Sequence, residues 1–225
     1  LLKYETGNRK FPAAVKGDPG STPSDADGAV ARESWVVSVL PGIEEQRLSD
    51  AYNRGVSPAH ASNQAVRSTR LTALLCPTDS FNVSPFMGSQ GVDTPALGDN
   101  WARGNYAANA SLGELNPASR RTGSTLEAWG RSLLRGMMGF NRAVRIQDVS
   151  DGTSKTVLLA EIRAGLFSYD NRGVWALGVA ASSSIWGHGG IDGDNYGPNC
   201  AEPFADDIFN CDQVRTAPLS TSTFT

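Results

Sequence analysis

Apolar residues occur only in short runs along this chain, and stretches rich in Gly, Pro, Ser and Asp separate those runs. The 225 residues include 24 Gly and 12 Pro, slightly above average usage, and only 19% are charged. Sequences punctuated in this way favour short strands and turns over a helical bundle. We therefore expect one loop-rich α+β domain over residues 1–225, with a small antiparallel sheet and long surface loops.

Three short apolar runs are the candidates for buried strands. They are LTALLCP (71–77), TVLLAEI (156–162) and GVWALGV (173–179). The segment AVRIQDV (143–149) alternates in part, as an edge or half-buried strand does. Residues 34–53 change character at Pro41, because β-branched residues come first and apolar residues at near-helical spacing follow. A helix could start at this proline, or a strand could end there.

Long polar stretches account for much of the remaining chain. The segment 112–140 is interpreted as an insertion, polar at first and then with helical apolar spacing interrupted by Gly. Gly, Ser, Asp and Asn dominate residues 181–225, which predicts a long loop region. Loops of this length are common in proteins whose surface carries the function, such as filament or coat subunits.

Charge and hydropathy restrict the classes of partner. The net charge is −3 and the Lys and Arg residues are scattered, so nothing predicts nucleic-acid binding. No run of 18 or more apolar residues is present, so no segment of this chain is predicted to span a membrane. The chain starts abruptly with apolar residues, and residues 1–12 are interpreted as the end of an N-terminal helix that begins before Leu1. Membrane contact is expected only through that missing part.

The three cysteines do not all pair within the chain. Cys200 and Cys211 enclose a short loop, and a disulfide between them would imply an oxidising compartment. Cys76 is then left over, either as a buried thiol or as the partner of a cysteine outside this chain. No Cys or His spacing predicts a zinc site.

The stretch DGTSKT resembles a phosphate-binding loop only superficially, because it lacks the spaced glycines and the Gly-Lys-Ser/Thr of such loops. Asp151 and Gly152 form a strong turn dipeptide, Thr153 can bond nearby backbone groups, and Thr156 is expected to enter the following strand. Glu161 ends that strand. It either pairs with an arginine, Arg163 or Arg145, or has a functional role.

No catalytic arrangement is predicted, so we expect a protein that is not an enzyme. The histidines are His60 and His188, and no G-x-S-x-G motif is present. A hydrolase triad would have to bring Ser154 near His188, for which the sequence gives no reason.

One loop carries weak calcium candidates. Asp192, Asp194 and Asn195 place oxygen ligands close together among glycines, and Asp206-Asp207 could add carboxylates. The pattern lacks the glutamate of an EF-hand, so a solvated turn is the default. No cofactor is expected, with Ca²⁺ the one alternative.

The tryptophans and two asparagines leave further possibilities open. Five tryptophans (Trp35, Trp101, Trp129, Trp175 and Trp186) are dispersed, as core or interface residues are. A binding module for carbohydrate or another solute would instead line a pocket with two or more of them. Asn82 and Asn109 match the short acceptor pattern for N-glycosylation.

Several stretches, by their order and spacing, resemble the DUF1559 family of pilin-like proteins, which is abundant in planctomycetes. They are LLKYETGNRKFP, SWVVSVLPGIEEQRLSDAYN, LLCPTD, GNYAANAS, DVSDGTSKTVLLAE and GPNC…DDIFNC. The sequence departs from the family pattern at Gly42, where an aromatic residue is usual, and at Lys155, where Asn is usual.

The resemblance implies a type IV pilin-like or pseudopilin-like subunit. It implies a prepilin-type leader and a long apolar helix before Leu1, and a final strand after Thr225. Copies of the protein would then assemble into an extracellular filament or surface structure, with the α+β head facing solvent. Many family members carry a cysteine in the first helix, which makes that residue a candidate partner for Cys76. The resemblance brings no catalytic residues, and an extracellular carbohydrate- or solute-binding module is the alternative function.

Overall fold

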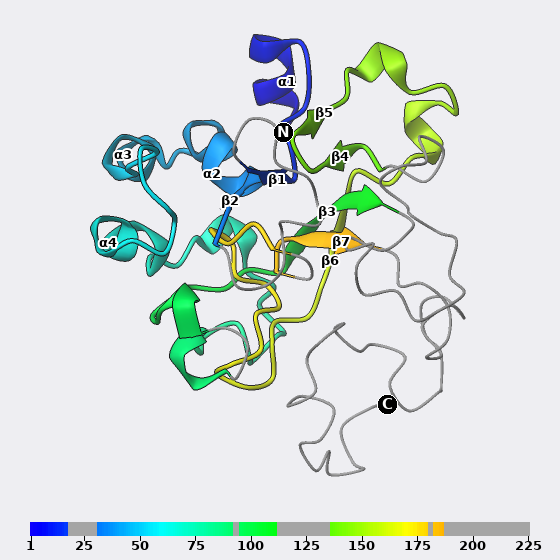
Figure 1. Ribbon diagram of the computed structural model, residues 1–225. Coiled ribbons are helices and arrows are strands. Elements are labelled where there is room, and N and C mark those ends of the chain that lie inside the picture. The colour runs from blue at the N-terminus through cyan, green and yellow to red at the C-terminus, as the bar shows by residue number, and fades with distance from the viewer. Residues whose placement is uncertain (18–30, 92–94, 112–135, 180–181, 187–225) are drawn as a thin grey trace, which may run out of the picture.

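The computed structural model describes residues 1–17, 31–91, 95–111, 136–179 and 182–186 (Figure 1). Short helices and short strands are mixed in them, so the fold is α+β, as the sequence predicts. The α-helices are α1 (Leu2–Asn8), α2 (Trp35–Val39), α3 (Gln46–Ala51) and α4 (Gln64–Arg67). The 3₁₀ helices are η2 (Leu40–Ile43), η3 (Ala61–Asn63), η4 (Thr72–Leu74), η5 (Gly88–Gln90), η6 (Pro95–Leu97), η9 (Ile146–Asp148) and η10 (Thr153–Lys155).

Strand β3 is the centre of a three-stranded sheet with the order β6-β3-β7. It pairs antiparallel with β6, where Tyr106 lies opposite Glu161, and parallel with β7, where Ala108 lies opposite Ser184. This sheet is therefore mixed and not wholly antiparallel as expected. The strands of the described residues are β1 (Val15–Lys16), β2 (Glu33–Ser34), β3 (Tyr106–Ser111), β4 (Met138–Gly139), β5 (Arg142–Ala143), β6 (Leu159–Glu161) and β7 (Ser184–Trp186).

Small residues let other segments approach β3 closely. Ala107, Ala108 and Ala110 are fully buried. A Cβ atom on Gly136 would lie 2.3 Å from the carbonyl oxygen of Asn109, so glycine is required where the chain before β4 passes this strand. The central strand can therefore be covered by neighbouring backbone as well as by side chains.

Large side chains from distant parts of the chain form one core. Helix α2, the segment that contains η2, strand β3 and the segment 174–179 all contribute to it. The largest fully buried apolar side chains are Trp101, Trp175, Phe86, Phe140, Leu40 and Leu71. Burial of these side chains is the main source of stability that the structure shows.

A helix lies within the segment 1–12, as expected, but it ends at Asn8, and its start before Leu1 stays a prediction. Helix α1 has no buried residue, although Leu1 and Tyr4 pack against the core. It ends where Arg9 adopts a left-handed conformation and donates its N–H to the Glu5 carbonyl. Figure 1 shows α1 beside β5 at the rim of the molecule.

The segment 34–53 is helical on both sides of Pro41. Ser34 caps α2 by accepting a hydrogen bond from the Val36 N–H at 3.2 Å, so the β-branched residues lie in a helix. Pro41 lies inside η2 near its start, where its missing N–H costs no hydrogen bond. Helix α3 follows, as the apolar spacing predicts.

Most of the predicted strands are wrong or too long. The segment 71–77 forms η4, because a 3₁₀ turn brings both Leu71 and Leu74 to the core. The segment 173–179 forms buried turns, whose uniform burial leaves no periodicity to read. Only Leu159–Glu161 of the segment 156–162 is a strand, and 143–149 contributes only Ala143, at the end of β5.

Two of the three strands in the main sheet come from segments that the sequence did not mark as strands. The small polar stretch 104–111 contains the central strand β3. Strand β7 lies at the start of 181–225, so the prediction of a loop region is wrong there. Likewise β4 lies within 112–140, while residues 112–135 and 187–225 are outside the described residues. No helix in the described part is both long enough and apolar enough to cross a membrane.

Candidate functional site

A buried amide, Asn105, connects three of the sequence motifs. Its side-chain oxygen accepts hydrogen bonds from the Cys76 N–H and the Asn82 amide, both at 2.9 Å. Its side-chain nitrogen donates to the Asp79 carboxylate at 2.5 Å and to the Ile162 carbonyl at 3.0 Å. All four hydrogen-bonding positions of this amide are therefore used.

The partners of Asn105 come from motifs that lie far apart in the sequence. Cys76 and Asp79 belong to LLCPTD, Asn105 belongs to GNYAANAS, and Ile162 follows the strand of TVLLAE. The Asp79 carboxylate also accepts the N–H groups of Phe81 and Ala164, both at 2.8 Å. The motifs thus meet as one hydrogen-bonded junction beside β3. The side chains of Asn105 and Asp79 bind backbone groups there and hold these segments together.

Arg103 fixes two loops through their carbonyl groups. It is 1% exposed and donates to the carbonyl oxygens of Ser84 (2.9 Å), Arg172 (2.6 Å) and Phe167 (2.9 Å). Burial lowers the pKa of Arg103 to about 10, and the nearby charge of Asp170 opposes that shift. Asp170 is itself fully buried and pairs with Arg172 at 2.7 Å.

Arg67 plays a similar role for another stretch of backbone. Its guanidinium donates to three successive carbonyls, those of Pro58, Ala59 and His60, at 2.8–3.2 Å. It also lies over the ring of Trp101, 4.7 Å from the ring centre, which is a favourable cation–π geometry. Burial lowers the pKa of Arg67. Both buried arginines therefore hold backbone segments in place.

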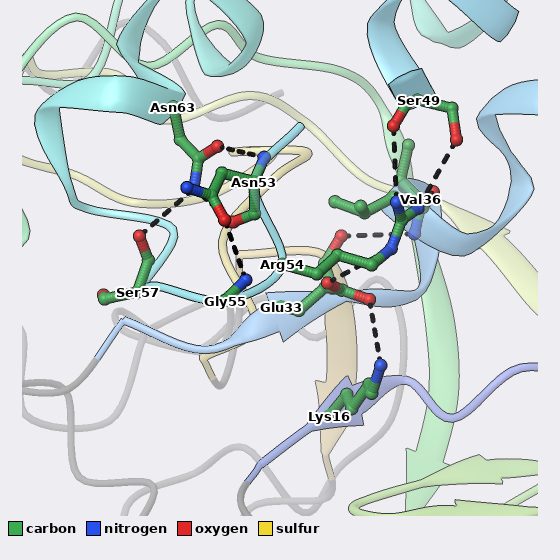
Figure 2. A network of polar contacts seen from close by, with 11 residues as sticks. Lys16, Glu33, Val36, Ser49, Asn53, Arg54, Gly55, Ser57 and Asn63 are labelled. Carbon is green, nitrogen blue, oxygen red and sulfur yellow. Dashed lines mark hydrogen bonds and ion pairs between the residues drawn. The ribbon is translucent and has the colours of Figure 1, made fainter. Parts of the chain in front are cut away.

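Figure 2 shows a third polar network, in which Glu33 lies between Lys16 and Arg54. The charged atoms are 3.8 Å and 4.0 Å apart, so the pairs are ionic contacts without a direct hydrogen bond. Arg54 also donates to the Ser49 carbonyl at 3.3 Å, which connects β2 to α3. Asn63 joins the same region by accepting the Asn53 N–H at 2.8 Å.

Tyr52 lies in the core next to this network. It is 5% exposed, and the Arg54 guanidinium lies over its ring at 5.7 Å. Burial raises the pKa of Tyr52, and the negative charge of Glu33 raises it further. The neutral phenol is therefore the form that the fold accommodates.

The DGTSKT stretch is an exposed turn in the structure. Gly152 has a φ of +85°, which glycine adopts without strain. Thr153 begins η10, and the Thr156 hydroxyl donates to the Gly152 carbonyl at 3.0 Å. The expectation that Thr156 enters the strand is wrong, because this hydrogen bond keeps it in the turn and β6 begins at Leu159. Asp151 is exposed beside Ser150.

Glu161 is an exposed residue at the end of β6. Arg145, one of its two predicted partners, pairs instead with Asp148 at 2.8 Å, because the spacing of three residues brings that carboxylate within reach. This hydrogen bond lowers the pKa of Asp148 and raises that of Arg145. Pairing of Glu161 with Arg163 stays a prediction.

The remaining candidate residues fall into two groups. Cys76 is a free, part-exposed thiol whose sulfur lies 3.1 Å from the Thr78 hydroxyl oxygen. Asn82 is 4% exposed and its amide is bonded to Asn105, so this face of the fold offers no glycosylation acceptor at Asn82. The candidates that lie outside the described residues are Asp192, Asp194, Asn195, Asp206, Asp207, Cys200, Cys211 and His188.

The described tryptophans contradict a binding surface or an assembly interface built from them. Trp35, Trp101 and Trp175 are each at most 2% exposed, and each ring nitrogen donates to a backbone carbonyl. They are core residues, and the side chains of Trp129 and Trp186 lie outside the description. Where the structure describes the chain, no group of three or more His, Cys, Asp or Glu is placed to hold a metal.

Sequence reasoning missed the residues that build the polar junctions. Asp79 and Asn105 lie inside the motifs LLCPTD and GNYAANAS, so the sequence pointed to the right segments. It did not indicate that these two side chains bond to each other. Arg103 and Asp170 carry no such signal, because charged residues are mostly solvent-exposed and nothing in their sequence neighbours indicates burial.

Comparisons with known proteins give one match. The sequence model of one protein family, described as "Protein of unknown function (DUF1559)", matches residues 1–220. Searches of curated proteins and of solved structures found no match.

Proposed function

Since the chain belongs to the DUF1559 family, we propose that it is the head domain of a structural subunit, one that assembles with copies of itself into an extracellular filament or surface structure. Helix α1 carries this proposal. Leu1 at its N-cap and Tyr4 pack against the core, no residue of the helix is buried, and Leu2 is 67% exposed. An exposed helix at the rim of a head is the arrangement that a pilin-like subunit uses to join a shared helical core.

The buried charged groups support a scaffold role and not a catalytic one. Arg67 and Arg103 donate their hydrogen bonds to backbone carbonyls, and the Asp79 carboxylate accepts hydrogen bonds from backbone N–H groups and from Asn105. A catalytic acid, base or nucleophile needs a polar atom that a substrate can reach. The Arg67 Nε atom has no hydrogen-bond partner but is buried, and the other polar atoms of these side chains are occupied, so we propose a protein without enzymatic activity.

A fixed loop offers an apolar contact surface for neighbouring subunits. Asn82 is buried and anchored to Cys76 and Asn105, while Phe81 and Val83 on either side of it are 37% and 56% exposed. Apolar side chains held outward by a rigid backbone lose little entropy when a partner covers them. We name this pair, Phe81 and Val83, the apolar loop tip.

The experiment that tests the proposal is surface shearing of the native cells. Mechanical shear releases filaments and surface assemblies into the medium, where ultracentrifugation collects them. We expect the full-length protein in the high-speed pellet of the sheared fraction. Recovery of the protein only in the supernatant, as a monomer by size-exclusion chromatography, would reject an assembled subunit.

A further inference from the structure

Two aromatic rings lie stacked at the surface in the loop that follows β6. The rings of Phe167 and Tyr169 have centres 5.5 Å apart and planes within 5° of parallel. Both residues are part-exposed, in contrast to Trp101 and Trp175, which are buried. An aromatic ring face carries partial negative charge and is apolar, so a parallel pair at a surface can accept a third flat group.

The backbone of the loop that carries these rings is fixed by hydrogen bonds to two buried side chains, Asp170 and Arg103. The Asp170 carboxylate accepts the N–H groups of Leu166 (3.1 Å) and Arg172 (3.0 Å), which closes the loop on itself. Arg103 holds the carbonyls of Phe167 and Arg172 from below, at 2.9 Å and 2.6 Å. A Cβ on Gly165 would collide with Arg103 and Asp170, so the loop is also closely packed.

A buried arginine and a buried aspartate are costly groups for a simple connection. Each must be desolvated, and only a full set of hydrogen bonds offsets that cost. Here the set fixes a loop whose outward side chains include two stacked rings. A rigid loop of this kind presents the rings in one orientation, which lowers the entropy lost when a ligand binds.

Uncharged polar groups lie next to the rings. The Ser168 hydroxyl donates to the side-chain oxygen of Gln90, and the Met87 N–H donates to the Ser168 carbonyl at 2.6 Å. Gln90 is exposed, and its side-chain nitrogen has no hydrogen-bond partner among the described residues. Figure 1 shows this loop, in yellow, passing the green helices η5 and η6.

We propose that Phe167 and Tyr169 bind the apolar face of a pyranose ring in a neutral oligosaccharide. The C–H groups on that face carry partial positive charge, which matches the negative faces of the aromatic rings. The side-chain nitrogen of Gln90 donates to a hydroxyl group at the edge of the sugar. Asp170 is fully paired and buried, so no free charge at the loop favours a charged ligand. This site is independent of the proposed assembly.

The test is calorimetric titration of the purified protein with cellohexaose, chitohexaose and maltohexaose. At least one of them should bind, and Phe167→Ala or Tyr169→Ala should weaken that binding at least tenfold. Both substitutions keep the carbonyl that Arg103 holds, so the thermal transition should stay close to that of the unaltered protein. Tyr169→Phe keeps the stacked pair and should keep the binding, and Gln90→Ala should weaken it severalfold.

Phe81→Ala is the matched control, because it removes another exposed aromatic ring from a different loop. It should leave the affinity unchanged. The proposal is overturned if none of the three oligosaccharides binds, or if Phe167→Ala and Tyr169→Ala bind as tightly as the unaltered protein. Loss of self-assembly in these variants without saccharide binding would assign the rings to a contact between copies, and would equally reject the saccharide site.

Discussion

At the scale of single residues, the Asn105 side chain is central to the fold, because its four hydrogen bonds hold several chain segments together. Replacing it with Ala removes four hydrogen bonds: the Cys76 N–H and the Ile162 carbonyl lose the side-chain partner that Asn105 gives them, and Asp79 and Asn82 each lose one of their hydrogen bonds. We expect Asn105→Ala to lower the free energy of unfolding by about 3 kcal/mol, because each unsatisfied buried group keeps its desolvation cost. Urea denaturation followed by circular dichroism measures this loss.

Asn109 is the matched control for that substitution, since it is an asparagine in the same strand. Its side-chain nitrogen makes one hydrogen bond, to the Val157 carbonyl at 2.9 Å, at a part-exposed position. Asn109→Ala should cost only about 1 kcal/mol. Equal losses in the two variants would contradict the central role given to Asn105.

Tyr52 should make the protein sensitive to alkali. Its pKa is raised above the usual value of 10 in the folded state. The unfolded phenol therefore loses its proton first, and the stability that is present below pH 10 is lost as the pH rises. A loss of about 1.4 kcal/mol is expected by pH 11, and Tyr52→Phe should remove it.

Comparing the unaltered protein with Tyr52→Phe separates the effect of Tyr52 on stability from that of Arg103, which also titrates at alkaline pH. Arg103 has a lowered pKa, so its contribution to stability rises with pH between about 10 and its usual value of 12.5, which is the opposite sign. Urea denaturation at pH 9, 10 and 11 should show a difference between the unaltered protein and Tyr52→Phe that grows with pH. A difference independent of pH would contradict the account of Tyr52.

At the scale of elements, Gly165 determines whether the 165–172 loop can pack. A Cβ there would lie 2.5 Å from both the Arg103 Nη1 atom and the Asp170 carbonyl oxygen. Gly165→Ala should therefore cost about 2 kcal/mol through overpacking. Gly42 has nothing within 4 Å of its built Cβ, so Gly42→Ala should leave stability within about 1 kcal/mol.

Chemical denaturation of the two glycine variants at neutral pH provides the measurement. The reading of the loop as rigid predicts that Gly165→Ala unfolds at lower urea than Gly42→Ala. If both variants unfold at the same urea concentration, the loop can accommodate a Cβ atom at Gly165, which would contradict the close packing of this loop.

Helices were predicted from sequence more successfully than strands. The apolar spacing after Pro41 identifies α3, because a helical face shows its period within a few residues. The helix expected over residues 1–12 was inferred from the abrupt apolar start of the chain. The short buried segment 173–179 shows no period, since every side chain in it faces the core. Apart from Tyr106, strand β3 is made of Ala, Asn and Ser, which strand propensity does not favour.

The motifs that form the junction around Asn105 served only to identify the family resemblance, and no site was predicted there from the sequence. The structure brings together Asp79 from LLCPTD and Asn105 from GNYAANAS. That contact joins residues 26 positions apart, and no local rule links two such side chains. Arg103 was missed for the same reason, because all three of its carbonyl partners are 19 to 69 positions away.

At the scale of the whole molecule, the apolar loop tip should matter for assembly and not for folding. Val83→Lys places a charge where we propose that another subunit makes contact. We expect thermal stability to stay within about 0.5 kcal/mol of the unaltered protein, because the side chain is exposed. The amount of protein in the sheared high-speed pellet should fall at least tenfold.

Gln46→Lys is the control for added charge, because it alters an exposed position on α3. It should assemble as the unaltered protein does. If Val83→Lys also assembles normally, the apolar loop tip is not a subunit contact, although assembly through other surfaces would stand.

Immunogold electron microscopy of native cells, with antibodies raised against residues 1–225, tests the central claim most directly. A structural subunit predicts gold particles in rows along filaments, or in a continuous array on the cell surface. Gold scattered singly, with no filament or array beneath it, would contradict the claim that copies of this protein build a shared assembly.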